Sequence, residues 1–334
     1  MGKLGRCLRL GPGVMTVTAL AATDMQPRRP WNFLRRRLFA LGLSGRALVI
    51  AAPALWLTIF FLIPLLIVLQ VSLSASAIAI PPYLPLITTD AKGTVQMTLH
   101  LSNFIRLFQD SLYVVSYLNS IKIAAISTIL ALLVGYPIAY FIARASDRWR
   151  NILLMLIILP FWSSFLLRVY AWIGMLKNEG IINNFLEWTG LIHDPIPFLQ
   201  SDIAVYIGIV YCYLPFMILP LYTNLVKLDE SLLEASADLG ARPIRTFLSI
   251  TLPLSIPGIV AGSMLVFIPA IGEYVIPTLL GGSSFAMSGR VTFDEFFSNR
   301  DWPMASALAF AMLIVVVVPI MFMQSAQSAV VTKR

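Results

Sequence analysis

Cysteine and histidine are nearly absent from this chain of 334 residues, which holds two of each. Cys7 lies in a basic segment and Cys212 in an apolar run, so the sequence offers neither a disulfide framework nor a cluster of metal ligands. His100 and His193 stand alone in polar segments, where loop positions explain them better than metal binding. We therefore expect no metal site, and no Cys/His or Ser/His/Asp catalytic set is evident.

Charge is also scarce, and a phosphate-binding loop of the form G-x-x-x-x-G-K-[ST] is missing. Only 12% of the residues are charged, whereas 58% are hydrophobic, and the mean hydropathy is +0.84. Such a chain is too apolar for an ordinary soluble domain. We expect an integral membrane protein that is not an enzyme by itself and binds no cofactor.

Apolar residues gather in six stretches long enough to cross a bilayer, whose core of ~30 Å requires about 20 helical residues. The stretches run approximately over 47–73, 117–143, 152–176, 203–226, 254–280 and 304–323. Prolines inside most of them predict kinked helices. The expected fold is all-α, a polytopic membrane domain of six transmembrane helices over 47–328.

A basic tail, residues 1–46, precedes these stretches and carries nine Lys/Arg and one acid. We expect it to be cytoplasmic and disordered. Its first 22 residues resemble a signal peptide, but Gly11-Pro12-Gly13 interrupts their apolar part. Met1, Met15 and Met25 all remain open as the natural start.

Basic residues also set the expected orientation, because cytoplasmic loops are enriched in Lys and Arg. With the N-terminus inside, 17 of the 24 Lys/Arg face the cytoplasm and five lie outside. Both termini are then cytoplasmic, and so is the polar loop between the fourth and fifth stretches. Because most basic residues lie in cytoplasmic segments, the net charge of +8 does not require a surface that binds nucleic acid.

That polar loop, residues 227–253, has the signals of two short helices. Ser231-x-x-Glu234 has capping-box spacing, and Asp229 is an alternative cap. Gly240 suits the left-handed residue that ends a helix, and Pro243 suits the first turn of the next. Small apolar residues on such a hairpin predict docking onto another protein, with a helix lying on the membrane surface as the plainer alternative.

Three charged residues fall inside the expected spans, namely Lys122, Arg168 and Glu273. Burying such groups is costly, so each is a functional candidate. Glu273 is interpreted either as a carboxylate on the path of a cation or as the partner of Arg168 or Lys122 in a packing ion pair. All three charged residues lie in the external halves of their spans. Aromatic rings in these external halves could offer cation–π faces: Trp162, Tyr170, Trp172 and Tyr274.

The 227–253 loop also contains a motif that resembles one of a known protein family. Its pattern Glu234-Ala235-Ser236-x3-Gly240-x9-Ile250-x-Leu252-Pro253 resembles the Glu-Ala-Ala loop of ABC importer permeases, with Ser236 in place of the second Ala. In that family the loop forms the coupling helix that seats in the ATPase subunit. The resemblance implies a type I importer permease fold, a coupling loop at 227–250 and coupling roles for the motif residues together with Asp238 and Arg242.

Between about 160 and 303 the resemblance extends to the polyamine branch, the spermidine and putrescine permeases, and most to the putrescine permease subunits. The strings that carry it include Arg168-Val-Tyr-Ala-Trp-Ile-Gly174, Gly272-Glu-Tyr-Val-Ile-Pro277 and Asn299-Arg-Asp-Trp-Pro303. It implies a second permease subunit, two cytoplasmic ATPases holding ATP and Mg²⁺, an external polyamine-binding protein and a place in the inner membrane.

Three other functions stay open. The same importer plan could carry another solute, such as iron, sulfate or an opine, since the loop says nothing of cargo. A proton-coupled secondary transporter could use Glu273 as its proton site, but the loop motif would then be unexplained. A structural membrane scaffold would leave polyamine uptake unchanged after its deletion.

Overall fold

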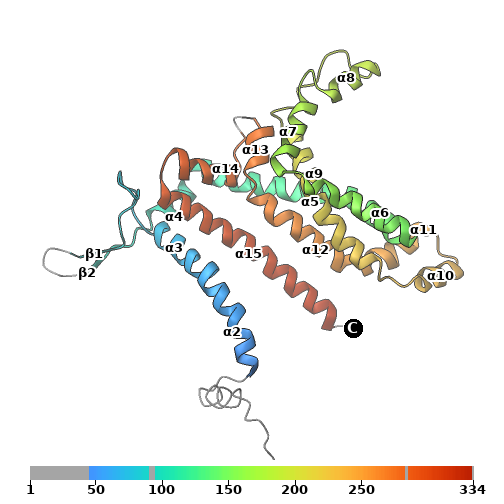
Figure 1. The fold of residues 1–334 in the computed structure, drawn as a ribbon, viewed down its shortest axis with the longest axis horizontal. Coiled ribbons are helices and arrows are strands. Elements are labelled where there is room, and N and C mark those ends of the chain that lie inside the picture. Colours follow the sequence, from blue (N-terminus) through green and yellow to red (C-terminus); the bar gives the residue numbers. More distant parts are fainter. Residues whose placement is uncertain (1–44, 90–94, 283–284, 333–334) are drawn as a thin grey trace, which may run out of the picture. The chain divides into compact units, whose positions relative to one another are not determined.

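The computed structural model describes residues 45–89, 95–282 and 285–332, and the predicted tail before Gly45 lies outside them. Helices dominate this part of the chain (Figure 1). The first is α2 (Gly45–Leu57), which runs into the π-helical turn η1 (Thr58–Leu62). Side chains from Val49 to Leu62 are exposed although apolar, which is typical of a helix surrounded by lipid. This segment forms a unit of its own, and the second unit begins at Ile63.

Three long helices form the centre of the second unit: α5 (Ser111–Arg144), α9 (Asp202–Leu225) and α12 (Leu252–Ile271). They pack against one another along their lengths, as Figure 1 shows. Their shared core includes Ala139, Met217 and Val266, none of which is exposed. Small residues let the backbones approach, since a Cβ added at Gly262 would lie 2.9 Å from Met217 Sδ.

Around this centre lie α3 (Ile63–Ser72), α4 (Ser102–Gln109) and α15 (Trp302–Thr332). Both α3 and α4 pack along α15. The connection between α3 and α4 holds two strands, β1 (Ile87–Thr89) and β2 (Val95–Met97), which pair antiparallel with Ile87 opposite Met97. Two strands of three residues leave the predicted all-α class intact.

The third and fifth predicted stretches are each broken. The third forms α6 (Asp147–Ile158), the 3₁₀ turn η2 (Leu159–Trp162) and α7 (Phe165–Leu176), with a bend of 92° between the two halves. Pro160 and the extended Ser163 account for this bend, because neither continues an α-helix. Beyond α7, the short helix α8 (Ile181–Trp188) precedes α9.

The fifth stretch does not reach residue 280 as one helix, so that prediction is wrong. It begins earlier, with α11 (Pro243–Thr246) and the π turn η3 (Phe247–Thr251), and α12 ends at Ile271. After the break at Gly272–Tyr274 follow α13 (Val275–Leu280), α14 (Ser288–Phe293) and the π turn η4 (Asp294–Ser298). α13 packs against α7 and α9.

Among the described residues, four helices satisfy a length and hydropathy test for membrane spans: Val49–Ser72, Ser111–Arg144, Asp202–Leu225 and Pro243–Ile271. The bent pair adds a fifth if it counts as one span. The sixth predicted stretch corresponds to α15, whose segment Trp302–Val318 is apolar but shorter than that test requires.

Candidate functional sites

The loop between α9 and α12 carries the short helix α10 (Ser231–Asp238). Asp229 Oδ1 accepts a hydrogen bond of 3.0 Å from the backbone N–H of Ser231, which lowers the pKa of this carboxyl below its usual value. The capping-box prediction is wrong, because the N-cap residue is Glu230 and its side chain makes no cap bond. Ser231 already belongs to the first turn, and Asp229, the alternative in the sequence, accepts its N–H from the position before the N-cap.

The end of α10 follows the prediction. Gly240 has a φ of +73°, the left-handed conformation that glycine adopts without strain. Its N–H donates to Ala237 O at 2.8 Å, and the N–H of Ala241 donates to Ser236 O at 3.1 Å, which is the Schellman pattern of a helix C-terminus. Pro243 occupies the first turn of the next helix, also as predicted. That second helix is not short, because it continues from Pro243 to Ile271.

One side of α10 is attached to the helical core. Arg144 Nη1, at the end of α5, lies 2.8 Å from Glu230 Oε1 and forms an ion pair. Ser236 is buried and its Oγ lies 2.8 Å from Thr246 Oγ1 of α11. The other side of the hairpin faces outward, with Leu239 88% and Ile244 75% exposed.

The remaining predicted coupling residues lie along the same loop and the start of α12. Exposed among them are Glu234, Ala235, Asp238, Arg242 and Pro253, whereas Ile250 and Leu252 are half-buried. The motif is therefore split between an outward surface and positions that join the loop to the core.

Glu273 lies in the break between α12 and α13, and its side chain is satisfied within the chain. Oε1 accepts hydrogen bonds from the backbone N–H groups of Val275 at 3.0 Å and Ile276 at 3.3 Å, so the carboxylate caps α13. Oε2 accepts a hydrogen bond from the hydroxyl of Tyr213 on α9. Glu273 is only 7% exposed, and these three hydrogen bonds compensate for the burial of its charge.

The predicted intramembrane charges do not converge. Within the described segments four ion pairs form, and none includes Glu273, Arg168 or Lys122. Lys122 is exposed on α5, whereas the Arg168 guanidinium lies 4.7 Å from the centre of the Phe161 ring, a cation–π contact. The packing ion pair at Glu273 is thus absent from the described segments, and hydrogen bonds take its place.

The predicted aromatic residues differ in their surroundings. Trp162 is 78% and Tyr170 57% exposed, so their rings are free of the core. Trp172 makes an edge contact with Tyr211, at 5.5 Å between ring centres. Tyr274 stacks on Phe293 of α14 at 4.0 Å, directly beside the break that holds Glu273.

A second buried carboxylate escaped prediction. Glu295 in η4 is 7% exposed, and its Oε1 accepts a hydrogen bond of 2.9 Å from the hydroxyl of Tyr113 on α5. Asn299 Nδ2 donates to Glu295 Oε2 at 3.0 Å. Glu295 lies between the fifth and sixth predicted stretches, outside every expected span. The only available signal was Asn299, in one of the family strings.

The break at Glu273 is covered by α14, which predicts the effect of one substitution. A Cβ added at Gly289 would lie 2.5 Å from the carbonyl oxygen of Gly272 and 2.7 Å from that of Glu273. Backbone atoms cannot yield as a side chain does, so we expect Gly289→Ala to destabilise the protein by about 1–3 kcal/mol or more. The yield and melting temperature of the purified protein measure this.

Gly174→Ala is the matched control, because a Cβ there has nothing within 4 Å in the described part of the chain. Equal melting temperatures for the two variants would show that α14 does not pack on the break in this way.

In the part of the chain that the structure describes, no group of three or more His, Cys, Asp or Glu side chains could hold a metal ion. Cys212 is a free, buried thiol in α9.

Comparison with known proteins adds three findings. The model of a family described as binding-protein-dependent transport system inner membrane component matches residues 131–333. The spermidine/putrescine transport system permease protein PotB of Salmonella typhimurium (strain SL1344) is 40% identical over 260 residues, covering 78% of this chain and 86% of that protein. The protein of the same name from Escherichia coli (strain K12) is 39% identical over 260 residues, covering 78% and 90%.

Among solved structures, a bacterial ABC transporter involved in the import of the acidic polysaccharide alginate covers 90% of this chain and 98% of its own, with a TM-score of 0.64. At 16% identity this similarity concerns the fold alone.

Proposed function

Because the chain belongs to the family of binding-protein-dependent transport system inner membrane components, and is a multi-pass permease, we propose that it is the membrane subunit of an ATP-driven polyamine importer. Spermidine or putrescine would pass inward through it, while a separate ATPase subunit would bind ATP and Mg²⁺. The observation that carries the polyamine assignment is the 40% identity, over 78% of the chain, to a spermidine/putrescine permease. The PotB proteins of Salmonella and Escherichia coli are named for both polyamines, so uptake measurements must decide between the two substrates.

The proposed partners follow from the same premise. They are a second permease subunit, two cytoplasmic ATPases and a periplasmic polyamine-binding protein. The outward side of the 227–253 loop is the proposed ATPase contact, because Leu239 and Ile244 expose apolar surface at the turn of a hairpin whose other side is attached to the core.

Two attachments would carry motion from this contact into the membrane helices. The Arg144–Glu230 ion pair joins the start of α10 to α5, and the Ser236–Thr246 hydrogen bond joins its middle to α11. Since α5 and α12 both pack on α9, a displacement of α10 would act on all three central helices. Closure of the ATPases would thus be coupled to the orientation of the path.

The proposed path residues include Glu273, Tyr274, Trp172, Tyr170 and Trp162. A carboxylate has about four positions that accept hydrogen bonds. Three donors bind the Glu273 carboxylate, so one position remains for an ammonium group. The exposed rings of Trp162 and Tyr170 offer faces for the same cation.

The deciding experiment measures uptake of radiolabelled spermidine and putrescine in a strain deleted for this chain and then complemented with it. We expect complementation to restore uptake of at least one polyamine, and an excess of sulfate, ferric iron or an opine not to compete. Competition by one of these solutes would favour an importer of that solute. Loss of uptake on dissipating the proton gradient, at normal ATP levels, would favour proton coupling instead.

Substitution of Glu234 tests the docking surface. Glu234 is exposed and does not cap α10, so Glu234→Ala should leave the subunit stable. We expect the amount of co-purified ATPase to fall about tenfold, as for the loss of one charge-assisted contact at an interface. Glu187→Ala, at an exposed position on α8, is the control. Unchanged co-purification in the Glu234 variant would remove this residue from the interface.

Reporter fusions test the orientation. Fusions after Arg150 and after Arg242 should report a cytoplasmic position, and fusions near Lys92, His193 and Asn299 a periplasmic one. A periplasmic signal after Arg242 would invert the arrangement and with it the ATPase contact.

A further inference from the structure

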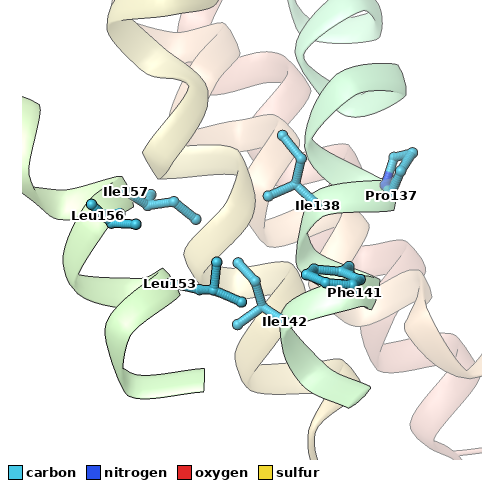
Figure 2. Close-up of a pocket in the computed structure, with 7 residues that line it drawn as sticks. All are labelled: Pro137, Ile138, Phe141, Ile142, Leu153, Leu156 and Ile157. Carbon is cyan, nitrogen blue, oxygen red and sulfur yellow. The ribbon is translucent and has the colours of Figure 1, made fainter. Parts of the chain in front are cut away.

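An apolar groove runs between α5 and α6, and the transport mechanism proposed above makes no use of it. Its volume is about 390 Å³, and all seven of its lining residues are apolar: Pro137, Ile138, Phe141 and Ile142 of α5, with Leu153, Leu156 and Ile157 of α6. Figure 2 shows Ile138 and Ile142 opposite Leu153 and Ile157, on the two facing helices. Phe141 is 65% and Leu156 57% exposed, so the groove opens to the surroundings of the helices.

The groove ends near the turn that joins α5 to α6, and this turn is rich in arginine. Ile142 precedes Arg144 by two residues, and Leu153 follows Arg150 by three. Arg150 closes the turn, because its Nη2 donates to Ala143 O and Ala145 O and its Nη1 pairs with Asp147. Both acids near the turn are therefore matched, Asp147 by Arg150 and Glu230 by Arg144.

Donors remain once these contacts are counted. Arg144 Nε, Arg144 Nη2 and Arg150 Nε are buried and have no hydrogen-bond partner among the described residues. Arg148 is exposed and takes part in none of the four ion pairs of the described segments. These buried atoms are closed to a ligand as the side chains stand, so the positive charge offered to an anion is that of the exposed Arg148 and of the 20% exposed Arg144 side chain.

We propose that the groove and this turn bind one anionic glycerophospholipid, with an acyl chain between α5 and α6 and the headgroup phosphate on Arg144 and Arg148. The phosphate oxygens accept hydrogen bonds from the exposed Arg148 guanidinium and lie near the positive charge of Arg144. Basic sites between transmembrane helices are suited to anionic headgroups for the same reason. An apolar helix of a second subunit would fill the groove equally well but would bring no anion to Arg148. Trp149, 62% exposed on the same turn, suits the headgroup level of a bilayer.

The test uses the full chain, assembled with its partner subunits, in nanodiscs of equimolar phosphatidylglycerol and phosphatidylcholine. After transfer to detergent, native mass spectrometry counts the retained lipids of each class. We expect wild type to retain phosphatidylglycerol in preference to phosphatidylcholine. Arg148→Gln should reduce that preference about fivefold, the factor for one basic residue near an anionic surface. Lys177→Gln removes an exposed cation at the end of α7 and should leave the preference unchanged.

Two further variants test the groove itself. Ile138→Trp fills it, and Leu156→Trp fills it from a position already 57% exposed, where a larger ring does not disturb the core. Each should lower retention of both lipids at least threefold. Equal retention of the two lipids by wild type, or unchanged retention in Leu156→Trp, overturns the proposal. A photoreactive residue at Phe141 that cross-links to the second permease rather than to lipid also overturns it. None of these readouts depends on transport, so they stand apart from the polyamine assignment.

Discussion

Gly240→Val should lower polyamine uptake at least tenfold while the subunit remains in the membrane. The residue has a φ of +73°, a conformation that costs a β-branched residue roughly 1–2 kcal/mol or more. A Cβ at this position has nothing within 4 Å among the described residues, so the effect comes from the backbone alone and not from a clash. Relaxation of that strain would break the Schellman bonds to Ser236 and Ala237 and turn the exposed side of α10 away from its partner.

Gly240→Asn is the matched control, because asparagine adopts the left-handed conformation far more readily than valine. It should retain most of the uptake and of the co-purified ATPase. Uptake and ATPase co-purification would be measured together for wild type and both variants. Wild-type values in Gly240→Val would mean that the shape of the hairpin is not what the ATPase recognises.

Glu273→Gln should lower uptake by about tenfold with little loss of protein. The amide keeps the size of the carboxylate, and its oxygen still accepts from the N–H groups of Val275 and Ile276, so the cap on α13 survives. What disappears is the negative charge, and a charge-assisted contact to an ammonium group is roughly twice as strong as a neutral one. Initial rates of uptake over a range of spermidine concentrations measure the loss.

Companion variants separate transport from structure at this site. Glu273→Ala removes the cap as well, and should reduce the amount of protein in the membrane. Tyr213→Phe keeps the charge and removes only the hydroxyl that donates to Oε2. Arg168→Met should not restore the Gln variant, because Arg168 lies against Phe161 and not in an ion pair with Glu273. Normal uptake in an abundant Glu273→Gln protein would mean that the only role of Glu273 is to cap α13.

Local rules of backbone conformation made the 227–253 loop largely predictable. Gly240 and Pro243 are residues whose φ angles are restricted or unusual, so their places at a helix end and a helix start follow from the sequence. The capping-box prediction failed because α10 begins at Ser231, which places this residue in the first turn and not at the N-cap.

The Glu273 site was only half predictable. The carboxylate is conspicuous in an apolar run, but its donor, Tyr213, lies 60 residues away on another helix. Spans that are apolar on all sides carry no periodicity to show which way a tyrosine faces, so this pairing has no signal in one sequence. The break at Gly272 was hidden because mostly apolar residues resume after Glu273 and extend the stretch to Leu280.

The helix that starts at Pro243 ends at the break beside Glu273, and its 29 residues form a rod about 43 Å long. If the loop is displaced as proposed, this helix would act as a lever arm whose length and phase are both set by its residue count. A sideways push of about 2 Å on one end would tilt it by roughly 3°, and one inserted residue would turn the far end by about 100° and advance it by about 1.5 Å. Its π-helical turn, Phe247–Thr251, lies within the 227–253 loop segment. A change of bend at this turn, within the first nine residues of the helix, would therefore set how far its other end moves.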